Sequence, residues 1–326
     1  MRILIIGGTR FIGRHLVPLL LDEGHDLTLL NRGTREFPWP EANIQQILCD
    51  RNDTPGLKEK LTGLTYDAVI DMVLSDGTQA KDIIELLQEK CSQYVMISTL
   101  SAYAPPYQCP VREEDPLETN TANAYGYHKA QAEEALMAAY RDHGFPATIL
   151  RLPAVYGEYD VQIREKYYIK RIIDQRTQIL LPEGGVGAVH REYAGNIAAQ
   201  LAFLLTKPET IGEVYNSGHH RVQTYRALVE DALAVMDHKM ALYSVPAPLH
   251  PAVPDLAWPM LMFQSTAKLE ALGWQEPFTP LKALERTIAW LRQEPDEIIA
   301  THRNKERHFD YAKEDEVIAA HGVLLR

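Results

Sequence analysis

Tyr125 and Lys129 are the residues best suited to proton transfer in this 326-residue chain. They lie in the segment Asn123-Ala-Tyr-Gly-Tyr-His-Lys129, early in a helix predicted over Ala122–His143. A spacing of four residues places both side chains on one helical face. A nearby ammonium favours the tyrosinate form of a phenol, and such a tyrosine can exchange a proton with a substrate hydroxyl or carbonyl. Taken alone, however, this spacing more often marks an exposed tyrosine and a solvated lysine.

Two further hydroxyl groups follow the strand predicted over Tyr94–Ile97. The chain continues there as Ser98-Thr-Leu-Ser-Ala-Tyr103. Ligands in open α/β sheets bind at the carboxyl ends of parallel strands. The hydroxyl of Thr99 or of Ser98 is therefore a candidate to share a substrate oxygen with Tyr125. The alternative is a Ser/Thr-rich strand end that only caps a turn.

The start of the chain predicts a dinucleotide site. A short apolar run, Ile3–Ile6, precedes a glycine-rich turn and a helix predicted over Phe11–Asp22. Backbone N–H groups at such a turn and helix N-terminus attract a pyrophosphate, and glycine lets the backbone approach it closely. The predicted cofactor-binding residues of this turn are Gly7, Gly8, Thr9, Arg10, Phe11, Ile12 and Gly13.

The end of the second predicted strand, Leu27–Leu30, favours NADP over NAD. NAD enzymes of this fold place a carboxylate there, on the ribose hydroxyls, but this chain has Asn31 and Arg32. A guanidinium attracts the 2′-phosphate of NADP, and Arg10 can join it from the glycine-rich turn. The alternatives are NAD as the cofactor and an Arg32 that is only a solvated turn residue.

Strands and helices alternate through the first half of the chain. This order predicts an α/β fold with a Rossmann-type doubly wound parallel sheet, and continuous apolar strands suit a sheet that is buried on both faces. The remaining predicted strands are Gln46–Cys49, Ala68–Ile70 and Thr148–Leu152, and the remaining predicted helices of this half are Pro55–Leu61 and Thr78–Glu89.

Changes in sequence texture divide the chain into two domains and a tail. We expect an NADP-binding Rossmann domain from residues 1–157 and 188–218. A smaller, discontinuous α/β domain on the substrate side is expected from residues 158–187 and 219–294. The tail, residues 295–326, is charged and is expected to be partly helical.

Composition excludes several functional classes. A net charge of -11 argues against a nucleic-acid or membrane-surface binder, because both need clustered positive charge. The three cysteines form no CxxC pair and adjoin no His cluster with metal-ligand spacing, so we expect neither a disulfide scaffold nor a metal site. No segment is long and apolar enough to span a bilayer, and the chain starts with a strand rather than a signal peptide. A reduced, cytoplasmic location is therefore expected.

The sequence leaves open the roles of two groups of basic residues in the second half of the chain. His190 and the His219-His220 pair can face a substrate, although a core or surface role is more typical of scattered histidines. Arg191 follows the glycine-rich segment Pro182–Gly187 and can meet a substrate phosphate or form an ordinary ion pair.

Taken together, these segments resemble the extended short-chain dehydrogenase/reductase family, the NAD-dependent epimerase/dehydratase group. The resemblance covers most of the chain and implies a Rossmann domain, a nicotinamide cofactor and a small-molecule substrate, often a nucleotide sugar. It also suggests a homodimer through the helix that carries Tyr125 and its neighbour. The segments that carry it are Gly7–Gly13, Ile97-Ser-Thr99, Tyr125-x-x-x-Lys129, Arg151-Leu-Pro-Ala-Val-Tyr-Gly157, Val189-His-Arg-Glu-Tyr193, Glu213-Val-Tyr-Asn216 and Leu272-Gly-Trp274.

The resemblance also implies residue roles. Tyr125 would be the acid/base residue, Lys129 would bind the nicotinamide ribose and tune Tyr125, and Thr99 would supply the catalytic hydroxyl. Asp50 and Arg51 resemble the family's contact to the adenine edge. Epimerases and dehydratases return the hydride within one turnover and reductases do not, and the sequence leaves these outcomes open.

Departures from the family pattern suggest an atypical branch. Arg10 replaces the middle glycine of the turn, and Pro153 stands where many members have Asn. With the ending Phe309-Asp-Tyr-Ala-Lys-Glu-Asp315, these features resemble chloroplast stem-loop RNA-binding proteins. The alternative function is therefore a non-catalytic NADP-sensing or RNA-associated regulatory protein on the same scaffold. The presence of Tyr125, Lys129 and Thr99 favours the enzyme.

Overall fold

The computed structural model describes residues 1–160, 162, 164–246, 261–293 and 309–325. Two compact units divide the chain. Unit 1 consists of Met1–Pro153, Ala194–Gly218 and Gln264–Pro277, and unit 2 consists of Ala154–Tyr193, His219–Phe263 and Phe278–Arg326. Residues 247–260 of the expected substrate-side domain, and residues 295–308 of the expected tail, lie outside the described residues.

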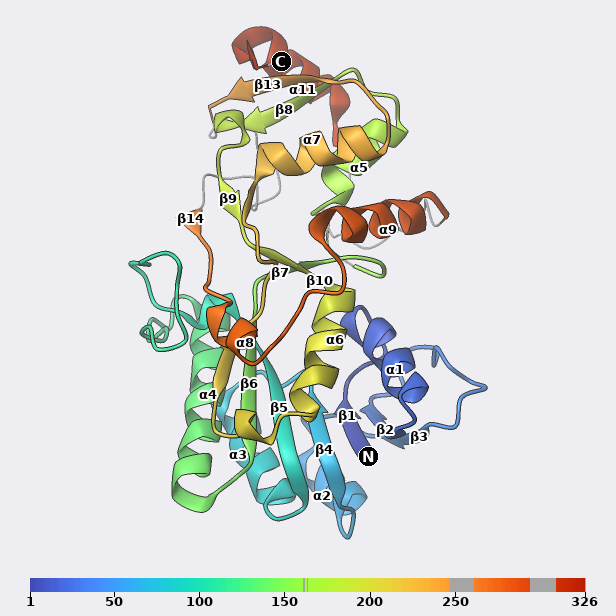
Figure 1. Ribbon diagram of the computed structural model, residues 1–326, viewed down its shortest axis with the longest axis vertical. Coiled ribbons are helices and arrows are strands. Elements are labelled where there is room, and N and C mark those ends of the chain that lie inside the picture. The colour runs from blue at the N-terminus through green and yellow to red at the C-terminus, as the bar shows by residue number, and fades with distance from the viewer. Residues whose placement is uncertain (161, 163, 247–260, 294–308, 326) are drawn as a thin grey trace. The chain divides into compact units, whose positions relative to one another are not determined.

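Unit 1 is built on a seven-stranded sheet (Figure 1) in the order β11-β6-β5-β4-β1-β2-β3. All neighbouring strands in it are parallel. The order reverses between β1 and β4, and ligands bind at such switch points in open α/β sheets. The strands are β1 (Arg2–Ile6), β2 (Asp26–Asn31), β3 (Gln45–Leu48), β4 (Tyr66–Asp71), β5 (Cys91–Thr99), β6 (Ala147–Leu152) and β11 (Val214–Asn216).

Helices cover both faces of this sheet. Helix α3 lies beside α4, and α1 lies beside α6 (Figure 1). Leu4 and Ile6 of β1 belong to one core with Ile83 of α3 and Leu136 of α4. Alternate residues of a strand point to opposite faces, and the other face of β1 is buried as well. The helices of unit 1 are α1 (Ile12–Asp22), α2 (Thr54–Leu61), α3 (Gly77–Leu87), α4 (Ala124–His143), α6 (Ala194–Leu205) and α8 (Ala267–Ala271).

The predicted doubly wound Rossmann-type sheet is thus confirmed, and burial on both faces explains why its strands are continuous apolar runs. Side-chain caps set the first residues of helices α3 and α4. Asp76 accepts the N–H groups of Thr78 and Gln79 and so caps α3. Asn123 accepts the N–H of Gly126 and caps α4.

The described residues of unit 2 form three small sheets, in the orders β10-β7, β12-β9-β14 and β15-β13-β8. Its main core joins Ile169, Leu180, Leu228, Ile288 and Val317. Its strands are β7 (Ala154–Tyr156), β8 (Gln178–Pro182), β9 (Ala188–Val189), β10 (Arg191–Tyr193), β12 (Gln223–Thr224), β13 (Ala241–Val245), β14 (Leu261–Met262) and β15 (Val323–Leu324), and its helices are α5 (Lys166–Ile173), α7 (Tyr225–Val235), α9 (Pro280–Gln293) and α11 (Tyr311–His321).

The compact units differ from the expected domain ranges in four places. Residues 154–157 and 188–193, which were expected in the Rossmann domain, belong to unit 2. Residues 264–277 pack in unit 1, because the side-chain amide of Gln264 donates to the carbonyl oxygens of Arg151 and Ser217. The described part of the tail is no separate segment. Helix α11 contributes Glu314, which forms a buried ion pair with Arg171 of α5 in unit 2.

Within the described ranges, none of the helices combines the length and the apolar character needed to cross a membrane.

Candidate active site

Glycine shapes the turn between β1 and α1. Gly7 and Gly8 have φ values of +96° and +88°, which side chains rarely allow. A Cβ atom on Gly13 would lie 2.0 Å from the carbonyl oxygen of Gly8, so the start of α1 packs directly on the turn. Gly13 also donates its N–H to the carbonyl of Arg10 at 2.8 Å. This close backbone packing at a helix N-terminus is what a pyrophosphate site requires.

Adding a methyl group at Gly13 tests this turn. Gly13→Ala is expected to cost about 1–3 kcal/mol of stability and to weaken dinucleotide binding, because the helix start must move off the turn. Fluorescence titration with NADPH measures the binding. Gly24→Ala is the matched control, since Gly24 has a positive φ but no neighbour within 4 Å of an added Cβ. That variant should lose stability without losing affinity; equal affinity in both variants would contradict the role of Gly13.

The end of β2 offers donors and cations to a ligand. The side-chain nitrogen of Asn31 is buried and has no hydrogen-bond partner, while its oxygen accepts the N–H of Gly33 at 2.9 Å. Arg10, Arg32 and Arg35 are exposed, and within the described part of the chain none of the three pairs with a carboxylate. Burial, followed by the positive charge of Arg35, lowers the pKa of Arg10. The residues present therefore fit an anionic group near this strand end.

Asp50 and Arg51, in the segment after β3, make different contacts. Asp50 accepts the N–H of Asn52 at 2.9 Å. The guanidinium of Arg51 is directed inward, where it pairs with Asp71 and donates to Gln79 at 2.9 Å. Nε and one terminal nitrogen of this guanidinium are therefore already bonded within unit 1.

Tyr125 lies in the first turn of α4 and is 59% exposed. Among the described residues, its hydroxyl has no hydrogen-bond partner. The adjacent glycine sets the position of this turn, because a Cβ on Gly126 would lie 2.1 Å from the carbonyl oxygen of Ser101. The start of α4 thus packs on the short 3₁₀ turn Leu100–Ala102, which directly follows Thr99.

The two hydroxyls at the end of β5 have different environments. Ser98 donates to Glu133, a buried carboxylate that also receives the guanidinium of Arg151. Thr99 accepts the N–H of Ser101 at 3.2 Å and keeps its own O–H as a donor. Ser98 is therefore committed to a structural network, and Thr99 is the better candidate to meet a substrate.

Lys129 is buried one helical turn after Tyr125. Its ammonium donates to the carbonyl oxygens of Leu74, in the turn after β4, at 2.6 Å and of Ile97, near the carboxyl end of β5, at 2.9 Å. An ammonium has three donors, so one N–H is left for a ligand. Burial lowers the pKa of Lys129 to about 8, although the carboxylates of Asp71 and Glu133 act in the opposite direction.

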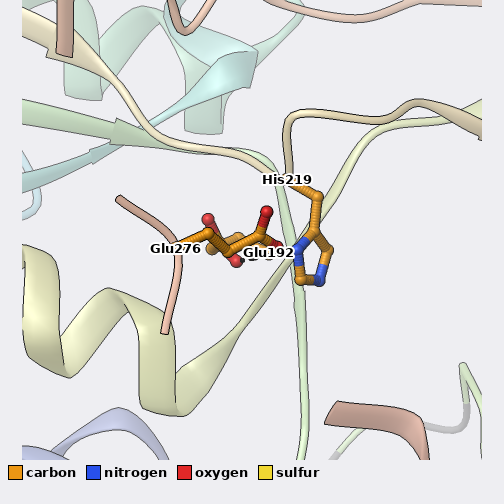
Figure 2. Close-up of side chains that lie close together, drawn as sticks. All are labelled: Glu192, His219 and Glu276. Carbon is orange, nitrogen blue, oxygen red and sulfur yellow. Dashed lines mark ion pairs between the residues drawn. The ribbon is translucent and has the colours of Figure 1, made fainter. Parts of the chain in front are cut away.

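Three of the basic residues that the sequence left open, His190, Arg191 and His219, are buried in unit 2, whereas His220 is exposed. His219 lies 3.4 Å from Glu192 (Figure 2) and its other ring nitrogen is 2.8 Å from the hydroxyl of Tyr156. Burial lowers the pKa of His190 to about 4, which keeps its ring neutral at pH 7. Arg191 forms a buried ion pair with Glu165. Of the alternatives left open by the sequence, the structure supports the core role for His190 and His219 and the ion pair for Arg191.

Sequence reasoning missed Asp71 and Glu133, whose charges reach Lys129. Both carried a signal. Asp71 ends the apolar run Ala68–Ile70 at a strand's carboxyl end, and Glu133 continues the four-residue spacing of Tyr125 and Lys129 along α4.

Comparisons with known proteins agree on the family. Residues 3–218 match the NAD dependent epimerase/dehydratase family. The chain is 26% identical over 242 residues to the chloroplast stem-loop binding protein of 41 kDa b of Arabidopsis thaliana, covering 70% of this chain and 61% of that protein. It therefore spans less than two thirds of that relative. It is 20% identical over 328 residues to the dTDP-D-glucose 4,6-dehydratase of Mus musculus, covering 90% of this chain and 89% of that one.

A solved structure agrees on the fold. The UDP-glucose 4-epimerase of Thermotoga maritima, solved with UDP-glucose, superposes with a TM-score of 0.75 at 18% identity, covering 90% of this chain and 100% of that chain. Because the family match extends over more than half of the chain, the chain belongs to the NAD dependent epimerase/dehydratase family, as its sequence predicted.

Proposed function

We propose that the protein is an oxidoreductase that binds NADP on unit 1 and moves a hydride to or from a hydroxyl- or carbonyl-bearing carbon of a small molecule. The proposed substrate class is a nucleotide sugar or a related compound. Membership of the family supports the nicotinamide cofactor. Similarity to a dTDP-D-glucose dehydratase, and to an epimerase solved with UDP-glucose, supports the substrate class.

The residues of unit 1 suit proton transfer at the reacting oxygen. Tyr125 would exchange a proton with that oxygen, and the O–H of Thr99 would donate to it. The remaining N–H of Lys129 would bind a ribose hydroxyl of the cofactor, and Gly7 to Gly13 would hold the pyrophosphate. A bound nicotinamide would supply the hydride chemistry.

One observation carries this proposal. Lys129 is fixed by two backbone carbonyls, one in the turn after β4 and one near the carboxyl end of β5. It lies one helical turn from an exposed phenol whose hydroxyl has no partner in the described part of the chain. A surface tyrosine and a solvated lysine would not need such an anchor. The ammonium of Lys129 is buried, and burial of a charged group costs free energy unless the group is hydrogen-bonded.

Turnover of a substrate panel tests the function. The purified protein is incubated with NADP or NAD and a panel of UDP- and dTDP-sugars, and absorbance at 340 nm and anion-exchange chromatography follow cofactor and sugar. We expect nicotinamide binding and conversion of at least one sugar. Binding without conversion of any sugar would favour the non-catalytic alternative, and absence of nicotinamide binding would overturn the proposal.

The preference for NADP rests on the end of β2. Asn31 and the exposed Arg32 stand where NAD enzymes of this fold carry a carboxylate, and the side-chain nitrogen of Asn31 has no hydrogen-bond partner among the described residues. The exposed Arg10, in the turn after β1, adds a second guanidinium. A carboxylate would repel a 2′-phosphate, whereas guanidinium groups bind phosphate through paired hydrogen bonds.

Titration with the two reduced cofactors checks this preference. The wild type should bind NADPH more tightly than NADH, and Arg32→Gln should weaken NADPH by about tenfold through loss of a charge-assisted hydrogen bond while NADH changes little. Arg2→Gln, at the opposite end of β1, is the control and should leave both affinities unchanged. Tighter binding of NADH by the wild type would contradict the prediction.

We further propose a cytoplasmic homodimer that pairs α3 and α4 of two copies. The resemblance to the family supports it, together with the adjacent course of these two helices. Analytical ultracentrifugation tests the oligomeric state. The net charge of -11 argues against nucleic acid as a partner.

A further inference from the structure

Asp71 is one of the buried carboxylates to which the proposed chemistry gives no role. Asp71 is the last residue of β4, and its side chain is fully buried. One carboxylate oxygen accepts the N–H groups of Val73 at 3.0 Å and Leu74 at 2.9 Å. The other accepts the hydroxyl of Tyr94 at 2.7 Å and pairs with Arg51. Asp71 therefore fixes the turn that follows β4.

The turn after β4 contacts two parts of the candidate site in unit 1, namely Lys129 and the glycine-rich turn after β1. The carbonyl oxygen of Leu74 accepts the ammonium of Lys129 at 2.6 Å. On its other side, a Cβ on Gly7 would lie 3.0 Å from the side chain of Val73, so the turn also packs against the glycine-rich turn. A substitution of Asp71 that moves this turn would therefore also displace Lys129 and the glycine-rich turn.

The partner of Asp71 extends the network to the segment after β3. Arg51 donates to the side-chain oxygen of Gln79 at 2.9 Å, and the amide nitrogen of Gln79 donates to Asn52 at 2.9 Å. Hydrogen bonds thus run continuously from Asn52, through Gln79, Arg51 and Asp71, to the turn that anchors the lysine.

We propose that Asp71 is a positioning residue of the candidate active site, and that its ion pair with Arg51 sets both the place and the charge of Lys129. The proposal rests on the role given to Lys129 above. It assigns the carboxylate a task in the reaction rather than in stability alone.

The charges around Lys129 support opposite effects for the two partners. Burial lowers the pKa of Lys129 to about 8, the carboxylates of Asp71 on β4 and Glu133 on α4 raise it, and the guanidinium of Arg51 lowers it further. Loss of the Asp71 charge should therefore lower this pKa, and loss of the Arg51 charge should raise it. Opposite signs follow if each charge acts on the ammonium in place, whereas a general loosening of the fold would relieve the burial of Lys129 and shift its pKa in the same direction in both variants.

Lysine NMR measures the effect directly. Protein labelled with ¹³C at lysine Cε is titrated with pH, and the signal of Lys129 is assigned by its loss in Lys129→Arg. We expect Asp71→Asn to lower the titration midpoint by about one pH unit or more, and Arg51→Gln to raise it. Asp67→Asn is the control, because Asp67 is exposed on the same strand and should leave the midpoint unchanged.

An unchanged Lys129 midpoint in folded Asp71→Asn, or shifts of the same sign in both variants, would overturn the inference. If circular dichroism shows that Asp71→Asn does not fold, Arg51→Gln alone decides it by the direction of its shift. The same samples are titrated with NADPH. Absence of cofactor binding by the wild type would refute the proposed function but leave the lysine titration interpretable, so the two failures are distinguishable.

Discussion

Replacing Tyr125 by phenylalanine is expected to reduce turnover by about 10²–10⁴-fold, the contribution typical of a positioned acid/base group. The fold and the affinity for NADPH should stay the same, because the side chain is 59% exposed and its hydroxyl has no partner among the described residues. The loss should therefore appear in kcat rather than in cofactor binding. Stopped assays on the sugar converted by the wild type, with NADPH titration in parallel, measure both quantities.

Tyr127→Phe provides the matched comparison. Tyr127 lies two residues later on the same helix and so points to a different face from the pair Tyr125 and Lys129. It should retain wild-type turnover. Full activity of Tyr125→Phe, or equal losses in both variants, would remove Tyr125 from the reaction.

Replacing Glu314 by glutamine is expected to cost about 3–5 kcal/mol, because it leaves a buried guanidinium without its counter-charge. Arg171 and Glu314 are 1% and 0% exposed and lie 3.0 Å apart. Glu314 also accepts the backbone N–H of Leu180 at 3.0 Å, so α11 is tied to both α5 and β8. Urea unfolding followed by circular dichroism measures the free energy of unfolding, and hydrogen exchange shows whether the lost stability lies in unit 2.

Two further variants separate charge from packing. The double variant Arg171→Leu with Glu314→Leu removes both charges and should recover most of the lost stability. Glu316→Gln breaks an exposed ion pair with Lys313 and should change stability by no more than about 1 kcal/mol. A loss in Glu314→Gln no larger than in Glu316→Gln would contradict the role of the buried pair.

Most of unit 1 could be predicted because its signals are local. Apolar runs between turn residues placed β1, β2, β4 and β6 to within a few residues. Side chains that cap helices, such as Asp76 and Asn123, lie directly beside the helices they start. Strand alternation with helices then leaves few topologies for a parallel sheet.

The candidate site was predicted where backbone geometry demands a residue type. Gly7 and Gly8 of the first turn have positive φ values, and Gly13 packs against the backbone of Gly8, so a side chain is disfavoured at each of the three positions. The pairing of Tyr125 with Lys129 follows from helical spacing alone. Their catalytic roles remain predictions.

Contacts between distant segments could not be predicted. The guanidinium of Arg51 turns inward because a buried carboxylate twenty positions later needs a counter-charge, and no local pattern around residue 51 encodes that partner. The pair of Arg171 and Glu314 joins segments 143 positions apart, which is why the described tail was expected to be separate. Such pairs depend on the complete fold.

The place of Glu314 has a consequence for synthesis. A nascent chain on the ribosome carries Arg171 through more than a hundred residues of translation before its carboxylate emerges. Until then the guanidinium of Arg171 lacks the carboxylate that pairs with it in the folded protein, and incompletely packed folding intermediates are vulnerable to aggregation and proteases. Messages or cleavage products that stop short of α11 should consequently be cleared by the cell rather than accumulate.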